Sequence, residues 1–441
     1  MKSLSAIILF LSFSLCALAQ AASTNSNPAQ INRTLTINEA ISWARQNHPL
    51  IAAARQRIAM ATGDRLEAGL RPNPSLTFSG ENFPLHRPEN GFNISRSIDW
   101  FATYSQTFET ARKRELRVAV AEGDINAAEA EVAAVERQVA YEVKTAFVQA
   151  LLARSRVTLA REALTHFQQI VNLNEIRVQA GYTAEGDLIK ARLETQRASY
   201  QARKAVLDYE RAKIALLRAM GENTFVTTFD LQGDLDFEPV SVNMTALTEV
   251  AMKQPQIRAA EARLERAKAA YQLEQAKARP DYTVTFGYKR NGPDNAMYGA
   301  LNVPLPLLNR NEGLVAKASA AVQSAEADLR FARSMVSAEI VLAQKSIESH
   351  RNQITALQSD FLKDADESQN ISLAAYREGA VELIVLLEAQ RARSQALDLY
   401  YQSVLDYRLA IFEMERAAGI EQLPSERQVT SLQKEKTETK R

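Results

Sequence analysis

Apolar residues recur at steps of three and four through a long stretch of the first half of the chain. No proline occurs between residues 88 and 239, or between residues 306 and 424. Both tracts are rich in Ala, Glu, Arg, Leu and Gln, so each favours very long helices. The recurring positions are Ile125, Ala128, Val132, Val135, Val139, Val143, Ala146, Ala150, Ala153, Val157, Ala160 and Leu164.

This spacing, kept over about 40 residues, predicts a coiled-coil seam. Many of the seam residues are alanine, so neighbouring helices can approach closely and form a thin wall rather than a thick core. A single helix from residue 112 to residue 180 would be about 100 Å long, at about 1.5 Å per residue. An ordinary globular domain does not need a helix of that length.

Four shorter segments alternate between apolar and polar residues with a period of two, which is typical of strands. In the clearest segment, apolar residues share one face and mostly Ser and Thr share the other, with Phe101 and Gln106 as exceptions. Each segment has about the ten residues that a tilted strand needs to cross a bilayer. The four segments are residues 75–83, 97–108, 282–289 and 297–305.

The same order of helices and strands occurs twice along the chain. Residues 48–54 are echoed at 254–260, and the pair Arg71-Pro72 returns as Arg279-Pro280. The separation of the copies shortens by about ten residues towards the C-terminus, which indicates an insertion in the first copy, after Phe83. We therefore divide the chain into a first repeat at 35–226, a connector at 227–242, a second repeat at 243–420 and a polar tail at 421–441.

Four strands with one apolar face cannot close a barrel, because the smallest common transmembrane barrels have about eight. The subunit must therefore oligomerise: two chains would supply eight strands and three would supply twelve. The aromatic residues Trp100, Tyr104, Tyr282 and Tyr288 are predicted to lie at the membrane interface, with their polar tips near the head groups. The alternative is that they form the core face of a soluble sheet.

Two glycines, Gly181 and Gly379, interrupt otherwise helical sequence at matching places in the two long tracts. We expect each to form the reversal of a helical hairpin, at the end far from the strands, with glycine adopting a positive φ. No segment after the first residues approaches the about 18 continuous apolar residues of a membrane-spanning helix. A membrane location would therefore require a closed barrel.

The N-terminus has the order of a secretory signal peptide at residues 1–21: Lys2, an apolar stretch, and small residues that predict cleavage after Ala21. Residues 22–34 then form a linker. The only cysteine, Cys16, leaves with the signal; as a lipid anchor it would follow Leu15, which is bulkier than the residue that such processing usually requires. The mature chain then has no thiol for a disulfide, a zinc site or nucleophilic catalysis.

The formal net charge of +1 includes Lys2, so the mature chain is neutral and gives no support to nucleic-acid binding. The sequence contains none of the common catalytic or nucleotide-binding motifs, so we expect no catalytic residue and no cofactor. We also expect no metal site, because the histidines are never paired at ligand spacing. They are His48, His86, His166 and His350.

Several segments resemble the TolC-like outer membrane efflux protein family, over almost all of the mature sequence. They are Asn47-His48-Pro49 with its echo Gln254-Pro255, Arg71-Pro72-Asn73-Pro74, and the paired Gly181 and Gly379. Two more segments resemble the cobalt-zinc-cadmium efflux branch more closely. They are Ser105-Gln106-Thr107-Phe108-Glu109 leading into Lys113-Arg114, and Pro304-Leu305-Pro306-Leu307-Leu308-Asn309-Arg310-Asn311-Glu312-Gly313.

This resemblance implies a mainly α protein with a small β part, built from two helix-strand-strand-helix repeats. It implies a homotrimer with a twelve-stranded β-barrel in the outer membrane of a Gram-negative bacterium, continued by a long α-helical barrel in the periplasm. The expected partners are outer-membrane lipid, a periplasmic adaptor protein, and an inner-membrane transporter that is driven by protons or, in other members, by ATP. The channel itself catalyses nothing.

The resemblance also assigns roles to single residues. The adaptor-docking tips carry over to Gly181 and Gly379, and the tip tyrosine to Tyr376. The constricting acidic pair carries over to Glu388 alone, because its second position is Val385.

Asp187, in the first copy, is another candidate for the periplasmic gate. In a trimer, Glu388 or Asp187 would occur three times around the axis, where repelling carboxylates favour cations and hinder tight closure. The alternative for each is a solvated charge on a helix surface.

The resemblance indicates heavy-metal cations as the first candidate substrates. A multidrug efflux channel and a type I secretion channel are the alternatives within the family. A soluble periplasmic coiled-coil scaffold is a more remote alternative, since it leaves four alternating segments of membrane length without a reason.

Overall fold

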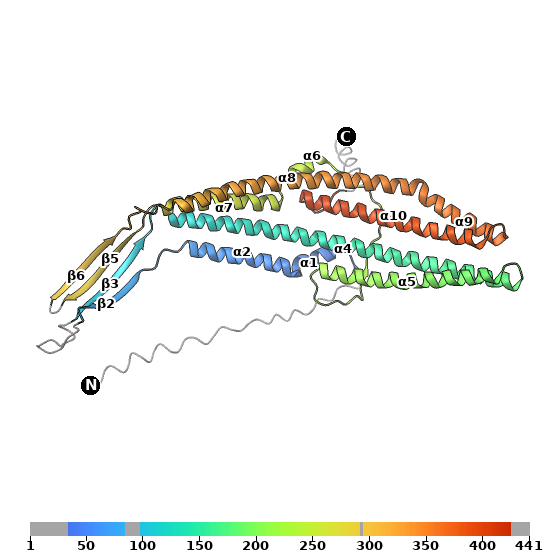
Figure 1. The fold of residues 1–441 in the computed structure, drawn as a ribbon, viewed down its shortest axis with the longest axis horizontal. Coiled ribbons are helices and arrows are strands. Elements are labelled where there is room, and N and C mark those ends of the chain that lie inside the picture. The colour runs from blue at the N-terminus through green and yellow to red at the C-terminus, as the bar shows by residue number, and fades with distance from the viewer. Residues whose placement is uncertain (1–33, 84–97, 292–293, 425–441) are drawn as a thin grey trace, which may run out of the picture.

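The computed structural model describes residues 34–83, 98–291 and 294–424. The predicted signal peptide with Cys16, nearly all of the predicted linker, the insertion after Phe83, His86 and the tail from residue 425 lie outside the described residues. The described part of the chain is elongated, with a small sheet at one end and long helices that extend to the other (Figure 1).

The first repeat contains a short strand, two helices, two long strands and a helical hairpin. Its hairpin reverses at the end farthest from the sheet (Figure 1). The elements are β1 (Thr34–Leu35), α1 (Ile37–Asn47), α2 (Pro49–Ala68), β2 (Ser75–Glu81), β3 (Asp99–Phe108), α4 (Lys113–Gln179) and α5 (Glu185–Ala219).

The second repeat has the same order, and the two repeats are joined by a connector that pairs back on the first. Its hairpin reverses at the same end as that of the first repeat (Figure 1). The connector contains β4 (Asp230–Leu231), which pairs with β1. The elements of the second repeat are α6 (Met244–Ala251), α7 (Pro255–Lys277), β5 (Tyr282–Asn291), β6 (Asp294–Asn302), α8 (Glu312–Ala356), a π-helical turn η1 (Leu357–Phe361), α9 (Leu362–Glu378) and α10 (Leu383–Ala418).

The long helix expected from the proline-free tract is α4, which has 67 residues. Near the sheet it packs against α2 and α7, and farther away against α5 and α10. The approach to α7 is so close that a Cβ atom on Gly123 would lie 2.7 Å from Cβ of Arg266. Small residues on the seam therefore produce the thin helical wall that the alanine pattern predicts.

The strands differ slightly from the segments expected from the alternating pattern. The fourth strand, β6, runs from Asp294 to Asn302 and so begins and ends three residues earlier than the segment 297–305. The reason is that Asn291 of β5 pairs directly with Asp294 of β6, which extends the hairpin through polar residues that alternation does not mark. The third strand, β5, extends past residue 289 to Asn291 for the same reason.

The core has two parts along the helical axis. A large cluster lies where α1, α4, α6 and α10 meet the connector, and Tyr407 at its centre accepts a hydrogen bond from Val240 N at 3.0 Å. A smaller cluster lies at the two hairpin ends and includes Phe167, Leu383 and Tyr376. None of the helices in the described part of the chain has the length and apolar character that crossing a membrane requires.

Candidate functional site

The sheet is antiparallel in the order β2-β3-β5-β6, so the strands of the two repeats meet at the β3–β5 pair. Register places Phe78, Ala102, Tyr288 and Met297 in one row on one face. Because side chains alternate along a strand, neighbouring rows face opposite sides. One face therefore carries mainly aromatic and aliphatic residues, and the other mainly polar residues, of which serine and threonine are the most frequent.

Hydroxyl groups pair across the polar face. Ser105 Oγ lies 2.8 Å from Thr285 Oγ1, and Thr107 Oγ1 lies 2.9 Å from Thr283 Oγ1. These pairs connect the two repeats side by side at the β3–β5 boundary. A wall of hydroxyl groups suits contact with water, as the lumen of a transmembrane barrel does.

The two exceptions in the alternating pattern each have a partner that the sequence does not reveal. Phe101 lies on the polar face, where Lys289 Nζ sits 4.7 Å from its ring centroid. Gln106 lies on the apolar face and donates from Nε2 to the carbonyl oxygen of Pro72 at 3.0 Å. Both exceptions to the alternation are therefore explained by a local contact, and the strand keeps its register through them.

The four aromatic residues predicted at the membrane interface all lie on the apolar face, and each is 39–48% exposed. Tyr282 lies at the end of the sheet next to the helices, where its ring stacks on Phe108 at 5.3 Å. Trp100 and Tyr288 lie towards the opposite end, and Tyr104 lies halfway, opposite Phe286. The structure thus separates these residues along the strands rather than gathering them at one level.

Both edges of the sheet are open within the described part of the chain. The outer strands β2 and β6 each pair with one neighbour. Unpaired strand edges carry free backbone donors and acceptors, which pair readily with another strand. Strands of another chain could therefore form hydrogen bonds with the backbone of β2 and of β6.

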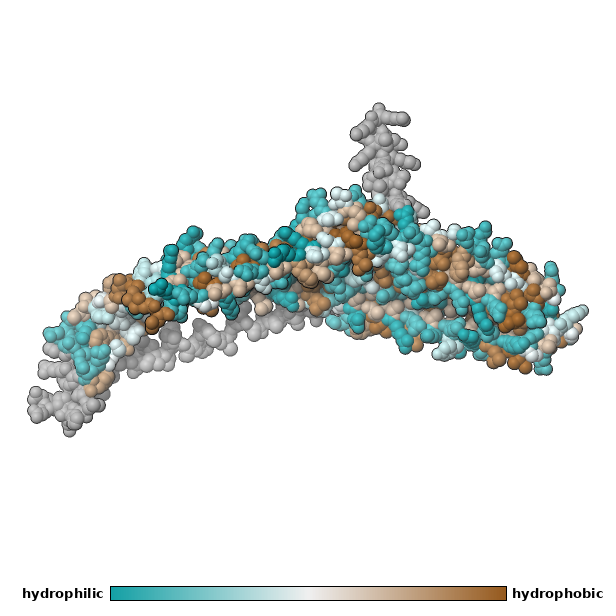
Figure 2. Space-filling view, turned by 45° about the horizontal axis from the view of Figure 1, so that its top comes forward, coloured by the Kyte–Doolittle hydropathy of each residue, from teal (hydrophilic) through white to brown (hydrophobic). Residues whose placement is uncertain are grey.

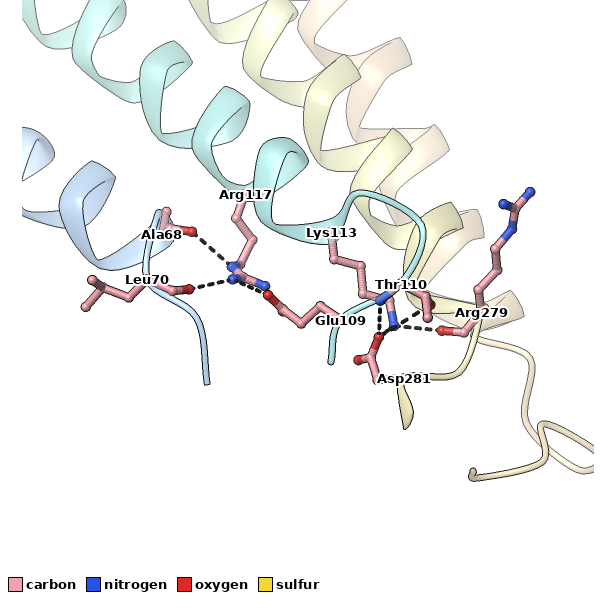
Figure 3. A network of polar contacts seen from close by, with 8 residues as sticks. All are labelled: Ala68, Leu70, Glu109, Thr110, Lys113, Arg117, Arg279 and Asp281. Carbon is pink, nitrogen blue, oxygen red and sulfur yellow. Dashed lines mark hydrogen bonds and ion pairs between the residues drawn. The ribbon is translucent and has the colours of Figure 1, made fainter. Parts of the chain in front are cut away.

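A polar network, which we call the junction network, ties the helices to the sheet (Figure 3). The buried Lys113, at the start of α4, donates from Nζ to Asp281 Oδ1 at 2.7 Å and to the Arg279 carbonyl at 2.6 Å. Thr110 N also donates to Asp281 Oδ1, at 2.8 Å. Burial alone would raise the pKa of Asp281, but these hydrogen bonds hold it below its usual value, so the carboxylate is charged at neutral pH.

The junction network continues to the next chain transition through Arg117. Its guanidinium pairs with Glu109 and donates to the carbonyl oxygens of Ala68 and Leu70, at 3.3 and 3.1 Å (Figure 3). The transitions from α2 to β2, from β3 to α4 and from α7 to β5 are therefore held together. The network fixes the direction in which the sheet leaves the helices.

Gly181 and Gly379 occupy the hairpin reversals, with φ of 75° and 80°. Both backbones are in the left-handed region, which favours glycine, and Gly379 is the C-cap of α9. Both reversals lie at the end of the molecule farthest from the sheet (Figure 1). We call this end, with the two reversals and the residues packed between them, the tip.

Tyr376 does not lie on the surface of the tip: its exposed fraction is 3%. Its hydroxyl donates to Asn174 Oδ1 at 2.6 Å, and the Arg177 guanidinium lies 5.0 Å from its ring centroid and donates to its carbonyl at 2.5 Å. Burial raises the pKa of Tyr376 above its usual value, so the phenol stays neutral. This residue joins the two hairpins from the inside.

The two gate candidates lie close to the tip in sequence. Asp187 is in the first turn of α5, half-buried, and pairs with Lys190 at 3.2 Å. Glu388 is on α10, on the exposed face that also carries Ile384 and Val385, while Leu386 and Leu387 face the core. Both carboxylates are therefore accessible to solvent in the single chain.

The junction network and Asn174 were missed by reasoning from the sequence. Lys113 and Asp281 are 168 residues apart, and Asn174 and Tyr376 are 202 apart. The repeat offers an indirect signal, because it predicts that the helix–strand transitions of the two copies lie side by side. Within the described ranges no group of three or more His, Cys, Asp or Glu residues could hold a metal ion.

Comparison with known proteins identifies the fold and the family. The model of the family described as "Outer membrane efflux protein" matches residues 40–222 and 246–419, which is most of the chain. The chain belongs to this family. It is therefore an outer-membrane efflux channel of a Gram-negative bacterium that extends into the periplasm, and it is a passive channel rather than an enzyme.

The proteins similar to this outer membrane efflux protein include two metal-resistance proteins and a channel of known structure. The cobalt-zinc-cadmium resistance protein CzcC of Cupriavidus metallidurans is 26% identical over 375 residues, which cover 84% of this chain and 86% of that protein. The nickel-cobalt-cadmium resistance protein NccC of Alcaligenes xylosoxydans xylosoxydans is 27% identical over 287 residues, which cover 64% of this chain and 63% of that protein. The crystal structure of CusC has a TM-score of 0.75 at 18% identity and covers 87% of this chain and 92% of its own, which confirms the TolC-like fold.

Proposed function

We propose that this outer membrane efflux protein is the exit duct of a tripartite efflux pump. Three copies join their sheets edge to edge into a twelve-stranded barrel, and their helices continue it as a periplasmic tunnel. The observation that carries the proposal is the open four-stranded sheet with one apolar and one hydroxyl-lined face. Edge pairing among copies satisfies the free backbone groups and turns the apolar face to lipid.

Heavy-metal cations are the substrates that we propose. The support comes from the two relatives, which are named for resistance to cobalt, zinc, cadmium and nickel. A duct for cations needs no metal ligands of its own, because ions pass through it in water. The Ser/Thr face provides such a wet wall.

We assign the periplasmic gate to the tip. In a trimer, Glu388 and Asp187 each provide three carboxylates around the axis, and their mutual repulsion favours cations. Tyr376, Asn174 and Arg177 hold the two hairpins of one subunit together, and so keep the tip closed. Opening then requires these contacts to separate.

The partners that we propose follow from the same arrangement. The exposed reversals at Gly181 and Gly379 are the surface on which a periplasmic adaptor docks, and the adaptor connects the duct to a proton-driven inner-membrane transporter. Tyr376 is buried beneath this surface, so it stabilises the reversals and does not contact the adaptor. Gly181 has open space around it, with no atom within 4 Å of a Cβ added there.

The experiment combines deletion of the gene with complementation. Growth is measured on zinc, cobalt, cadmium and nickel salts and on a panel of organic dyes, and the purified protein is sized in detergent by light scattering. We expect metal sensitivity that the wild-type gene rescues, and a mass of three chains. Sensitivity to dyes alone would reject the metal assignment, and a single chain that needs no detergent would reject the channel.

Two variants test the gate separately from the duct. Glu388→Gln and Asp187→Asn remove a charge without changing the size of the side chain. Glu162→Gln, at an exposed position on α4, is the control. The selectivity of single channels for potassium over chloride is measured in planar bilayers. We expect the gate variants to lose cation preference and the control to keep it; equal selectivity in all four proteins would remove both residues from the gate.

A further inference from the structure

The loop between β6 and α8 exposes three leucines to solvent. Leu305, Leu307 and Leu308 are 72%, 74% and 103% exposed. Hydrophobic residues gather on the surface where the sheet joins the helices (Figure 2). Apolar side chains so concentrated and so exposed mark a surface that something else covers.

The loop is held in this shape by the protein itself. Leu307 N donates to the Leu305 carbonyl at 2.9 Å, and Asn309 Oδ1 accepts from Asn311 N at 2.8 Å. The side chain of Asn311 donates to the carbonyl and carboxylate oxygens of Glu274, both at 2.8 Å, which fixes the loop to the end of α7. The leucines are therefore presented in advance, at little further cost in conformational entropy.

An exposed arginine occurs at each of the four transitions between helix and strand. Arg71 lies between α2 and β2, Arg112 between β3 and α4, Arg279 between α7 and β5, and Arg310 between β6 and α8. Figure 3 shows the Arg279 side chain turned away from the junction network. Each transition next to the end of the apolar face therefore carries an exposed cation.

Three acidic residues at this level are engaged with other cations. Asp281 binds Lys113, Glu109 binds Arg117, and Glu274 binds Lys277. The ion pairs of the described chain include none of the four exposed arginines. Their guanidinium groups are therefore available to an outside anion.

The position of these groups relative to the membrane identifies that anion. Tyr282 and Phe108 end the lipid-facing side of the sheet, Arg279 lies three residues before Tyr282, and Arg112 lies four residues after Phe108. This is the level of the phospholipid head groups in the periplasmic leaflet. Guanidinium groups bind phosphate oxygens in pairs, and leucines beside them suit the outer ends of acyl chains.

We propose that the three leucines and the four arginines form a lipid-anchoring belt, which inserts the β6–α8 loop into the periplasmic leaflet and binds the phosphate groups of its phospholipids. The belt sets the height of the barrel in the membrane. It rests on the proposed function in one respect, that the sheet forms a membrane-spanning barrel. The rival occupant of the leucines is a neighbouring subunit.

The first test locates Leu308. The only cysteine of the sequence, Cys16, lies in the predicted signal peptide, so a fluorescent thiol label is attached to Leu308→Cys in a Cys16→Ala background and, as a control, to Leu193→Cys on the exposed face of α5 in the same background. Both proteins are reconstituted in vesicles that contain nitroxide-labelled phospholipid. We expect strong quenching at residue 308, at least about threefold greater than at residue 193.

The other results of this test overturn the proposal in different ways. A label at 308 that neither the nitroxide lipid nor iodide in water quenches lies between subunits. A label that iodide alone quenches lies in water. If the wild-type chain does not enter vesicles at all, the proposed channel fails as well, which distinguishes the two failures.

The second test concerns the arginines. Arg71, Arg112, Arg279 and Arg310 are changed together to Gln, and Arg57, Arg197, Arg203 and Arg330, which are exposed on helices, serve as the matched control. The rise in Tm on adding phosphatidylglycerol to the detergent-solubilised protein is compared with the rise from phosphatidylcholine and from inorganic phosphate.

We expect wild type and the control to gain several degrees with phosphatidylglycerol, and the belt variant to lose at least about half of that gain. An equal gain in all three proteins overturns the proposal. So does the same gain with inorganic phosphate, which would mean that a free anion is the ligand.

Discussion

Tyr376 of α9 donates its hydroxyl hydrogen to Asn174 of α4 at 2.6 Å, and both side chains are buried. This hydrogen bond joins the helical hairpins of the two repeats at the tip. Tyr376→Phe removes the donor and leaves the Asn174 oxygen buried without it, which costs about 1–3 kcal/mol. We expect a lower Tm and higher channel conductance in bilayers, whereas Tyr182→Phe, at an exposed position beside Gly181, should change neither.

The reversals at the tip differ in how much space they have. Gly181→Ala and Gly379→Ala each place a Cβ on a left-handed backbone, at a cost of about 1–2 kcal/mol. In Gly379→Ala the new atom also lies 3.3 Å from Nη2 of Arg177, whose Nη1 donates to the Tyr376 carbonyl. Gly379→Ala should therefore reduce Tm and metal resistance more than Gly181→Ala; Gly186→Ala, within helix α5, should slightly raise Tm. Equal effects at 181 and 379 would argue against the role of Arg177.

Lys113 holds the junction network, and its side chain is buried. Lys113→Met leaves Asp281 and the Arg279 carbonyl without this donor, so we expect a loss of about 1–3 kcal/mol. The free energy of unfolding is measured by denaturant titration of the detergent-solubilised trimer. Lys253→Met breaks an exposed pair with Glu249 at 3.8 Å and should cost close to nothing.

His48 is the N-cap of α2, and its Nδ1 accepts a hydrogen bond from Leu50 N at 3.1 Å. Burial lowers the pKa of His48, so below about pH 6.5 the unfolded chain takes up a proton that the folded chain resists. Stability is therefore fully present above about pH 6.5 and falls as the pH drops towards the lower folded pKa. His48→Asn keeps a cap and should reduce the loss in Tm between about pH 7.5 and about pH 5.5; an unchanged loss would assign it to other groups.

Thr285 and Phe286 are neighbours on β5 that face opposite sides of the sheet. If the apolar side meets lipid, Phe286→Lys should cost about 2–4 kcal/mol near the middle of the membrane. Thr285→Lys, on the hydroxyl-lined side, should fold and insert normally. The amount of folded trimer in outer-membrane fractions measures both; equal yields would contradict the assignment of the two sides.

Reasoning from sequence succeeded where the signal was local. The spacing of apolar residues predicted the long helix α4, alternation predicted the two-faced strands, and glycine at matching positions predicted the two reversals. Each of these features depends on residues within a few turns or pleats of one another. The family resemblance is confirmed by the family match.

The site was predicted less completely. Tyr376 was predicted from the resemblance at an adaptor-docking tip, but it is buried between the hairpins, because a helix shows which residues share a face and not which helix will cover that face. The roles of Glu388 and Asp187 in a gate remain predictions. The repeat gave only an indirect signal of the junction network, since its charged members are residues of ordinary kinds that lie far apart in the sequence, in α4 and in the loops next to β3 and β5.

The sequence by itself determined the repeat, the long helices and the two faces of the sheet, because hydrophobic periodicity and backbone preference act between near neighbours in the chain. Only the tertiary structure decided that Lys113 meets Asp281 and that Asn174 meets Tyr376. Those contacts depend on how long helices align along their axes, where a shift of one residue moves a side chain by about 1.5 Å. That alignment is settled by packing summed over the entire helical wall.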